Sequence, residues 1–425
     1  MVAAADFSRY WSVVAGWLGL ETIFCIWLYR VDCCYSFDWL AYMQQVEVIL
    51  SGNVDYADVR GVTGPIQYPG GHALFFTLFY FLTDLGRSAL GKFILFLFLY
   101  LGSLLILAAL IRMSKSLPWY TFISLSFSRR IHSIYVLGFF SDPLCMLFLY
   151  ASLYVLLGYR HFIGASFLLS VAVSLKMNAL LFCPAFFLIF CWYNRNWLSW
   201  ILSTAVFMGW QITVALPFVL PSHRHYEHYL AFAFNFSRTF EHSQSVTWQF
   251  ISPDLFVSAL FARSLLVLLG LVWLLFAWKW STRYRHSLPQ HFELDMLLDV
   301  CLVTNLLGCA LARSLHYQFY AWYGLTVPML VLFPSKVPLL LRLIAWVLLE
   351  SGWNVHPPTP ASSIAIGSGH LLLLVSRFYW LDSNLDKASN GNAYDYYGNG
   401  NGNCNSNGVE ASERGRGGGK QRKVA

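Results

Sequence analysis

The chain has 425 residues, of which 57% are hydrophobic and 12% are charged, and its formal net charge is +7. Soluble proteins carry about 25% charged residues, so this composition excludes an ordinary soluble domain. Many Lys and Arg residues stand in short clusters between apolar segments, for example Lys279, Arg283 and Arg285. This pattern is typical of the positive loops of membrane proteins, and we expect no nucleic-acid partner.

Apolar segments recur along most of the chain. The first, residues 11–29, has no small-residue cleavage site after it and predicts an uncleaved membrane span. Segments of similar character lie at about 92–111, 134–157, 162–193, 198–220, 255–280, 296–312, 318–333, 337–350 and 362–380. Because backbone in lipid must satisfy its own hydrogen bonds, we expect an all-α polytopic membrane protein with roughly 10–13 transmembrane helices.

Two long loops, at about 30–71 and 221–254, are rich in polar and aromatic residues. The second contains the glycosylation sequon that begins at Asn235. The topology after the first loop stays open. If the short apolar segment 72–83 spans the membrane, Arg112 lies on the same side as the first loop; if it is re-entrant, Arg112 lies opposite.

Residues 381–425 change in character. They are rich in Asn and Gly and have too few apolar residues to form a core, so we predict a disordered cytosolic tail after a catalytic domain at 1–380.

The segment 38–50 predicts an amphipathic helix in the first loop. Asp38, Ala41, Tyr42 and Gln45 share one face by helical spacing. One interpretation makes Asp38 an N-cap only. The other makes it a general base at the membrane surface, and the two are compatible.

Several polar residues interrupt or border apolar segments, where ionisable groups usually face a cavity or a partner. They are His132, Asp142, Lys176, Asn178, Arg313, His316 and Gln318. Lys176 could instead extend its charge to an interface, and Arg313 could belong to an aromatic belt.

The residues that carry a family resemblance occur in order along the chain. They are Asp38-Trp39, Tyr42-Met43, Asp55-Tyr56, Gly61…Thr63-Gly64-Pro65…Tyr68-Pro69…Gly71, Arg130…His132, Asp142-Pro143, Lys176-Met177-Asn178, Arg313-Ser314-Leu315-His316-Tyr317-Gln318-Phe319-Tyr320 and Glu350-Ser351…Trp353-Asn354. Over about residues 11–380 the chain resembles the α-1,3-mannosyltransferases of the endoplasmic reticulum that use dolichyl-phosphate mannose in N-glycan precursor assembly. It departs from that pattern at Ser36, where the family usually has an acidic residue.

The resemblance implies a GT-C glycosyltransferase fold, a multi-pass protein of the endoplasmic reticulum membrane with a luminal active site. It implies dolichyl-phosphate mannose as donor, a five-mannose lipid-linked oligosaccharide as acceptor, and an inverting reaction without cofactor or essential metal. Asp38 would be the base. The donor would bind to Arg313, His316, Tyr317, Gln318 and Lys176, and the cavity would include Tyr42, Tyr68, His132, Asp142 and Asn178.

Three alternatives remain open at this level. A secondary transporter also carries buried ionisable groups, although we find no internal repeat. A sister transferase with another acceptor would share fold and chemistry. A noncatalytic membrane scaffold would not require Asp38.

Overall fold

The computed structural model describes residues 2–31, 36–194, 196–236, 238–285 and 293–389. The α-helices in these ranges are α1 Val2–Val31, α2 Phe37–Leu50, α3 Gly70–Leu82, α4 Ala89–Met113, α5 Thr121–Ser124, α6 Arg129–His132, α7 Asp142–Tyr159, α8 Phe162–Leu175, α9 Cys183–Tyr193, α10 Trp197–Val219, α11 His223–Ala233, α12 Pro253–Val257, α13 Ala259–Arg285, α14 Glu293–Ala310, α15 Val327–Leu332, α16 Leu339–Asn354 and α17 Pro360–Ser389. A π-helix, η1 Ser133–Leu137, and the 3₁₀ helices η2 Met177–Phe182, η3 His242–Gln244, η5 Tyr317–Trp322 and η6 Gly324–Thr326 connect them. Strands β1 Arg60–Gly61 and β2 Gly64–Pro65 form a small antiparallel hairpin.

Six helices in the described ranges are long and apolar enough to cross a bilayer. These spans are Ser8–Val31, Ala89–Met113, Asp142–Tyr159, Trp197–Val219, Ala259–Arg283 and Pro360–Tyr379, and three shorter apolar helices cover Gly70–Leu82, Phe162–Leu175 and Met177–Tyr193. The prediction of an all-α polytopic membrane protein is confirmed. The six long spans are fewer than the roughly 10–13 expected.

The difference arises because some apolar segments form shorter or interrupted helices. Segment 318–333 forms only η5, η6 and the short α15. Segment 162–193 is interrupted at Lys176, whose extended backbone ends α8. Irregular backbone at membrane depth is tolerated where protein surrounds it.

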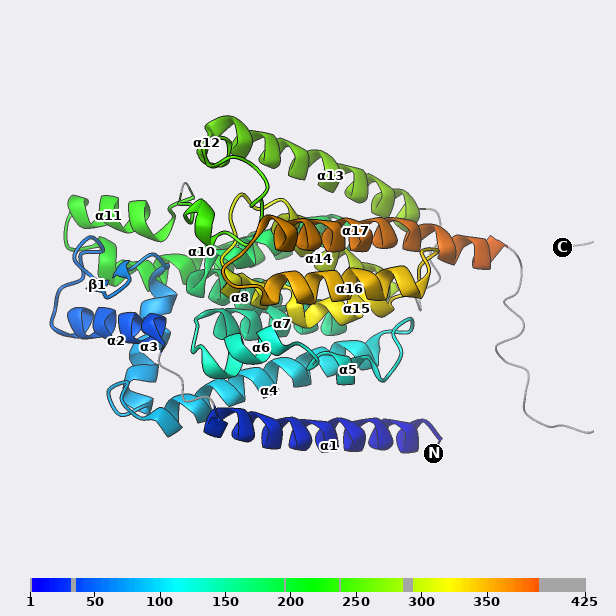
Figure 1. Cartoon of the computed structure of the whole chain (residues 1–425), viewed down its shortest axis with the longest axis horizontal. Helices are drawn as coiled ribbons and strands as arrows, with labels where there is room; N and C mark the ends of the chain where they lie inside the picture. The colour runs from blue at the N-terminus through cyan, green and yellow to red at the C-terminus, as the bar shows by residue number, and fades with distance from the viewer. Residues whose placement is uncertain (1, 32–35, 195, 237, 286–292, 390–425) are drawn as a thin grey trace, which may run out of the picture. The chain divides into compact units, whose positions relative to one another are not determined.

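The loop helices gather at one end of the long helices. Figure 1 shows α2, β1 and α11 at the end opposite the N-terminus; we call this the loop end. Helix α3 has 13 residues and is therefore about 20 Å long, less than the bilayer core of about 30 Å. Helix α4 then runs from the loop end to the other end, which carries Arg112, so the structure favours the re-entrant alternative for 72–83.

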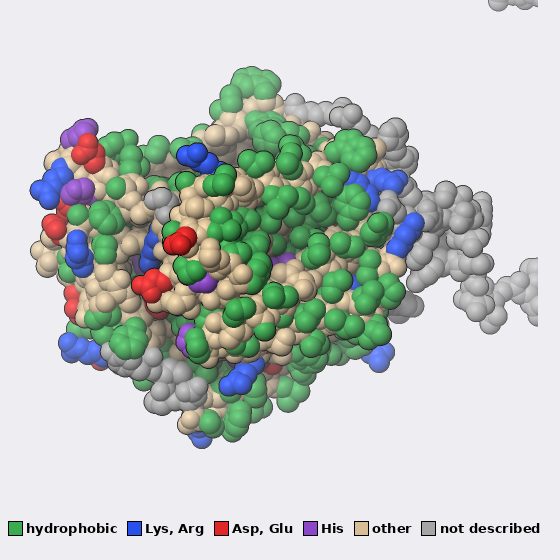
Figure 2. Space-filling view, turned by 45° about the horizontal axis from the view of Figure 1, so that its top comes forward, with side chains coloured by type: hydrophobic (Ala, Val, Ile, Leu, Met, Phe, Trp, Pro, Cys, Tyr) green, Lys and Arg blue, Asp and Glu red, His purple; other side chains and the backbone are tan. Residues whose placement is uncertain are grey.

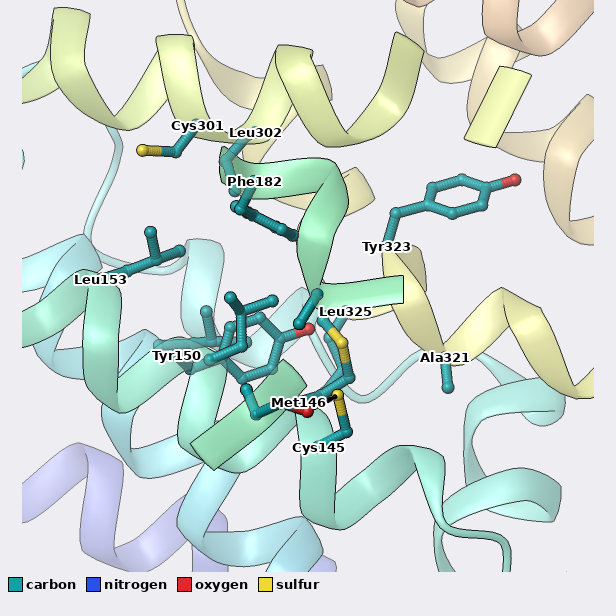
Figure 3. Close-up of a cluster of buried hydrophobic side chains, with 14 of the residues drawn as sticks. Cys145, Met146, Tyr150, Leu153, Phe182, Cys301, Leu302, Ala321, Tyr323 and Leu325 are labelled. Atoms are coloured by element: carbon teal, nitrogen blue, oxygen red, sulfur yellow. Dashed lines mark hydrogen bonds between the residues drawn. The ribbon is translucent and has the colours of Figure 1, made fainter. Parts of the chain in front are cut away.

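The core beside the loop end is made by α7, η2, α14 and η6. Met146 and Tyr150 of α7 lie with Phe182 and Leu325 in a buried apolar cluster (Figure 3). The thiol of Cys145 donates to the carbonyl oxygen of Ala172 at 3.3 Å, which ties α7 to the end of α8. This packing fixes the junction at Lys176.

The surface matches a membrane environment. Figure 2 shows hydrophobic side chains over most of one face, with acidic side chains toward the loop end and Lys and Arg side chains at both ends. Helices α10 and α13 are buried over only 17% and 11% of their most apolar stretches, so most of their apolar surface is available to lipid. In the C-terminal region, α17 continues to Ser389, beyond the predicted boundary at 380, and residues 390–425 of the predicted disordered tail lie outside the described residues.

Candidate active site

A cavity of about 480 Å³ lies among the loop helices. Of the residues proposed from the sequence, the structure brings seven to its wall: Asp38, Tyr42, Tyr68, Lys176, Asn178, His316 and Gln318. They come from α2, the first loop, the α8–η2 junction with η2, and η5 with the residue before it. Segments far apart in the chain thus meet at one hollow, which is the candidate active site.

Helix α2 begins with a cap that leaves Asp38 available. The hydroxyl oxygen of Ser36 accepts a hydrogen bond from the backbone N–H of Trp39 at 3.2 Å and donates to the carbonyl of Gly138 at 2.7 Å. Ser36 is therefore the N-cap, and the interpretation of Asp38 as an N-cap is wrong. In the described ranges no hydrogen bond engages the Asp38 carboxylate, which lies in the first turn and lines the cavity.

The surroundings of Asp38 favour a basic carboxylate. Burial raises the pKa of Asp38 above the ordinary aspartate value, the ammonium of Lys176 lowers it, and the carboxylate of Asp142 raises it again. The guanidinium of Arg238 lowers it further, and the resulting pKa lies above the ordinary value. A raised pKa means that the carboxylate holds a proton more firmly than a solvated one, as a general base must.

Lys176 forms a buried ion pair with Asp142. Its ammonium donates to both carboxylate oxygens, at 2.8 and 2.7 Å, and the indole N–H of Trp322 donates to the same carboxylate at 2.6 Å. Asp142 is fully buried and does not line the cavity. Asp142 therefore orients Lys176 and lies behind the cavity wall, whereas Lys176 and Trp322 form part of the wall.

The glycines of the first loop allow close packing around the cavity. A Cβ atom on Gly61 would lie 2.5 Å from the carbonyl oxygen of Ala41, so only glycine lets the β1–β2 hairpin rest on α2. A Cβ on Gly71 would lie 2.0 Å from the hydroxyl of Ser174, which shows how closely α3 approaches α8. The Gly-rich motif therefore serves packing, and it positions Tyr68 beside Tyr42, with hydroxyls 3.4 Å apart.

A contact between the two long loops holds α11 in place. The Nδ1 atom of His228 lies 2.6 Å from the carboxylate of Asp55, and the Tyr229 hydroxyl accepts from the backbone N–H of Gly70 at 3.1 Å. Burial raises the pKa of Asp55, but hydrogen bonds from His228 and from the backbone of Ala57 outweigh it and lower the pKa below the ordinary value. The lowered pKa favours the charged form of Asp55, which attracts His228 on α11.

His132 does not lie at the cavity, in contrast to the prediction. Its Nδ1 donates to the carbonyl of Ser128 at 2.8 Å, and its Nε2 lies 2.5 Å from the Glu21 carboxylate, which also accepts from the hydroxyl of Tyr100 at 3.0 Å. Cys25 completes a buried group with Glu21 and His132. These contacts join α1, α4 and α6, so His132 has a packing role.

Arg313 and Tyr317 also lie outside the cavity wall. The guanidinium of Arg313 donates to the carbonyl oxygens of Phe256 at 3.2 Å and Val257 at 2.7 Å, because α12 ends directly beside it. Tyr317 packs against the guanidinium of Arg130, 5.4 Å from its ring centre. Neither of the two side chains lines the cavity, contrary to their predicted role in donor binding.

His316 lines the cavity as a neutral ring. Burial, together with the nearby charge of Lys176, lowers its pKa to about 4. At neutral pH the ring is therefore uncharged, so His316 could contact the donor by hydrogen bonds but not by charge. Its ring stacks on Phe240 at 5.1 Å.

The sequence reasoning missed Arg238. This exposed residue of the second long loop lines the cavity, and its guanidinium lies 5.4 Å from the ring of Phe240. Lys176 and Arg238 are therefore the cations at the cavity. The only available signal was a basic residue in a loop expected to be luminal. Asn235 also lines the cavity, while Ser237 of its sequon lies outside the described residues.

Comparison with known proteins places these features in a family. The family model described as "ALG3 protein" matches residues 18–363. The chain is 33% identical to a human protein and 35% identical to one from Arabidopsis thaliana, both named Dol-P-Man:Man(5)GlcNAc(2)-PP-Dol alpha-1,3-mannosyltransferase. These alignments cover 88% and 82% of this chain, and 87% and 83% of the relatives. A relative of the same name from Kluyveromyces lactis is 31% identical, over 84% of this chain and 83% of its own length. No solved structure matches the chain.

Proposed function

The chain belongs to the ALG3 protein family, and from this membership we propose that it transfers mannose from dolichyl-phosphate mannose to a Man(5)GlcNAc(2) lipid-linked acceptor, forming an α-1,3 bond. The observation that carries the proposal on the structural side is the cavity, where the carboxylate of Asp38, which has no hydrogen-bond partner among the described residues, lies within the electrostatic reach of two cations, Lys176 and Arg238. A base and a site for a leaving phosphate are the two groups that this reaction needs.

The reaction proceeds by a single displacement. Asp38 takes the proton of the acceptor 3-hydroxyl as its oxygen attacks the anomeric carbon of the donor. The bond between that carbon and the phosphate oxygen breaks, and dolichyl phosphate leaves. Because the donor mannose is β-linked and the product bond is α, one inversion suffices and no covalent enzyme intermediate is required.

The departing phosphate lies between the cations. Lys176 keeps its ammonium in place through Asp142, so its charge is directed before the donor arrives. Arg238 approaches from the second loop and can bind phosphate oxygens with its planar fork. Neutral His316 and Gln318 supply hydrogen bonds rather than charge.

The prenyl chain of the donor occupies a lipid-facing groove. A groove of about 520 Å³ between α13, α14 and α17 is lined almost entirely by apolar side chains, including Leu268, Phe276 and Leu371. Trp248 also lines this groove, and its indole N–H donates to the carbonyl of Ala312 at 2.8 Å. Two residues further, Ser314 lines the cavity, so the groove approaches the reaction site.

The compartment follows from the same reasoning. As a multi-pass membrane protein of N-glycan precursor assembly, the chain resides in the endoplasmic reticulum membrane. The loop end, with both long loops and the cavity, faces the lumen. The opposite end carries Arg112 and Lys115, as positive-inside bias requires for the cytosolic side.

Transfer by the purified chain tests the proposal. The detergent-solubilised protein is incubated with dolichyl-phosphate mannose and the five-mannose lipid-linked acceptor, and the expected product carries a sixth, α-1,3-linked mannose. Mannose transfer only to a different lipid-linked acceptor would favour a sister transferase. No transfer to any acceptor, from a folded protein, would overturn the proposal.

A further inference from the structure

Two glutamines at the cavity have buried side-chain oxygen atoms that accept no hydrogen bond from the described residues. The side-chain carbonyl oxygens of Gln45 and Gln67 have no hydrogen-bond partner among the described residues. Gln45 is only 3% exposed, and both glutamines line the cavity. Leaving a buried acceptor unpaired is unfavourable, so such atoms on a cavity wall are suited to the donor groups of a ligand.

These atoms are held in place before any ligand binds. The amide nitrogen of Gln45 donates to the carbonyl of Gly64 at 3.3 Å, in the β1–β2 hairpin. The neighbouring Gln44 fixes the same hairpin by accepting from the backbone N–H of Val62 at 2.8 Å. Together with the close approach of Gly61 to α2, these bonds leave the Gln45 oxygen little freedom to find another partner.

The position of Gln45 indicates which ligand group it meets. It follows Asp38 by seven residues on α2, which corresponds to about 10 Å along the helix axis. The cations that act on the Asp38 carboxylate are Lys176 and Arg238, whereas Gln45, Gln67 and the nearby Thr63 are uncharged. Uncharged amides and a hydroxyl suit the hydroxyl groups of a sugar, whereas a phosphate would be drawn to the cations.

We propose that Gln45 and Gln67 form a subsite that recognises the acceptor sugar adjacent to the mannose that is extended. The inference rests on the proposed function and deepens it. The donor carries one sugar, which must reach Asp38, whereas the acceptor carries several and extends beyond the reacting hydroxyl. An amide can accept from one hydroxyl and donate to its neighbour, so the two glutamines select acceptors that place a sugar at this point.

Steady-state kinetics with two acceptors tests the subsite. Q45M and Q67M keep side-chain length but remove the amide. The acceptors are the complete five-mannose lipid-linked oligosaccharide and a synthetic truncated one in which the extended mannose is attached directly to the lipid carrier, without its neighbouring sugar. The control is Q211M, because Gln211 on α10 also has a buried unpartnered oxygen but does not line the cavity.

With the complete acceptor, each cavity variant should raise the acceptor KM about tenfold and leave the donor KM unchanged. With the truncated acceptor, wild type and variants should have the same KM, and Q211M should match wild type throughout. An unchanged acceptor KM, or an equal loss with both acceptors, would overturn the subsite. Q67M keeps the test available if Q45M does not fold. A wild-type protein that transfers to neither acceptor would overturn the proposed function itself.

Discussion

The ammonium of Lys176 and the carboxylate of Asp142 face each other at 2.8 and 2.7 Å in the wall behind the cavity, and both side chains are buried. An ion pair in such a place contributes little net stability, but the loss of one partner leaves an uncompensated buried charge. Lys176 therefore depends on Asp142 to remain charged toward the cavity.

The pair predicts an asymmetric mutational effect. D142N should destabilise the protein by about 3–5 kcal/mol, because Lys176 loses its counter-charge in a buried site. The double variant K176M/D142N should regain most of that stability but not mannose transfer. Unfolding midpoints in detergent, with transfer assays on the same samples, measure both effects. Equal midpoints for the single and double variants would contradict the account.

Asp38 as base predicts a loss of rate without a loss of stability. D38N should lower kcat by about 10²- to 10⁴-fold, the usual contribution of a general base, and leave the unfolding midpoint unchanged. D58N is the matched control, since Asp58 is an exposed carboxylate of the same loop outside the cavity. A D38N variant with wild-type kcat would remove Asp38 as the base.

The raised pKa of Asp38 predicts the acid side of the pH profile. Only the ionised carboxylate accepts a proton, so kcat should fall as pH decreases through the Asp38 pKa, which lies above the ordinary aspartate value. Because the Arg238 charge lowers that pKa, R238Q should move the acid limb to higher pH. A limb that stays in place in R238Q would show that another group controls it.

Arg238 as a phosphate ligand predicts a donor-specific defect. R238Q should raise the KM for dolichyl-phosphate mannose about ten- to hundredfold, since a hydrogen bond to a charged group is lost, and leave the acceptor KM unchanged. R60Q is the control, because Arg60 is exposed in the first loop, lies outside the cavity wall, and donates to the carbonyl of Ala57 at 2.7 Å. Donor KM values that are equal in R238Q and R60Q would argue against the assignment.

The contact between Gly61 and α2 predicts a steric effect. G61A should destabilise the protein by about 1–3 kcal/mol and raise the acceptor KM, because the added methyl group would meet the carbonyl of Ala41 and displace the hairpin. G209A on α10 should be neutral, since no atom lies within 4 Å of a Cβ at that position. Unfolding midpoints and acceptor KM check both variants, and a neutral G61A would refute the packing role.

Composition and apolar periodicity predict the class of the protein well, because a chain with so few charges must be surrounded by lipid. They do not reveal which apolar segments form long continuous helices, because a segment that folds into short helices, such as 318–333, has the same composition as one that forms a single long helix. The residues around a polar side chain in the sequence also do not reveal which distant residues will form its hydrogen bonds. Nothing near Arg313 in the sequence indicates that α12, more than 50 residues earlier, supplies its hydrogen-bond acceptors.

For the candidate site, residue type and motif order identify most of the cavity wall, but the charge states require the fold. His316 is neutral because of burial, and Arg238 reaches the cavity because α11 is held by Asp55 and His228. Ser36 is instructive in another way. The departure from the family pattern concerns the residue that caps α2, and serine performs that task through Trp39.

Helix α1 has only 17% of its most apolar stretch buried, yet one stripe of polar contacts runs along it. Tyr10 donates to Ala108, Trp17 donates to Ser126, and Glu21 meets Tyr100 and His132. In lipid, an evenly apolar helix rotates and slides at little cost, whereas polar contacts at fixed heights do not permit it. The axial position of the first span against its neighbours is thereby set, so α1, α4 and α6 would move through the bilayer as one unit.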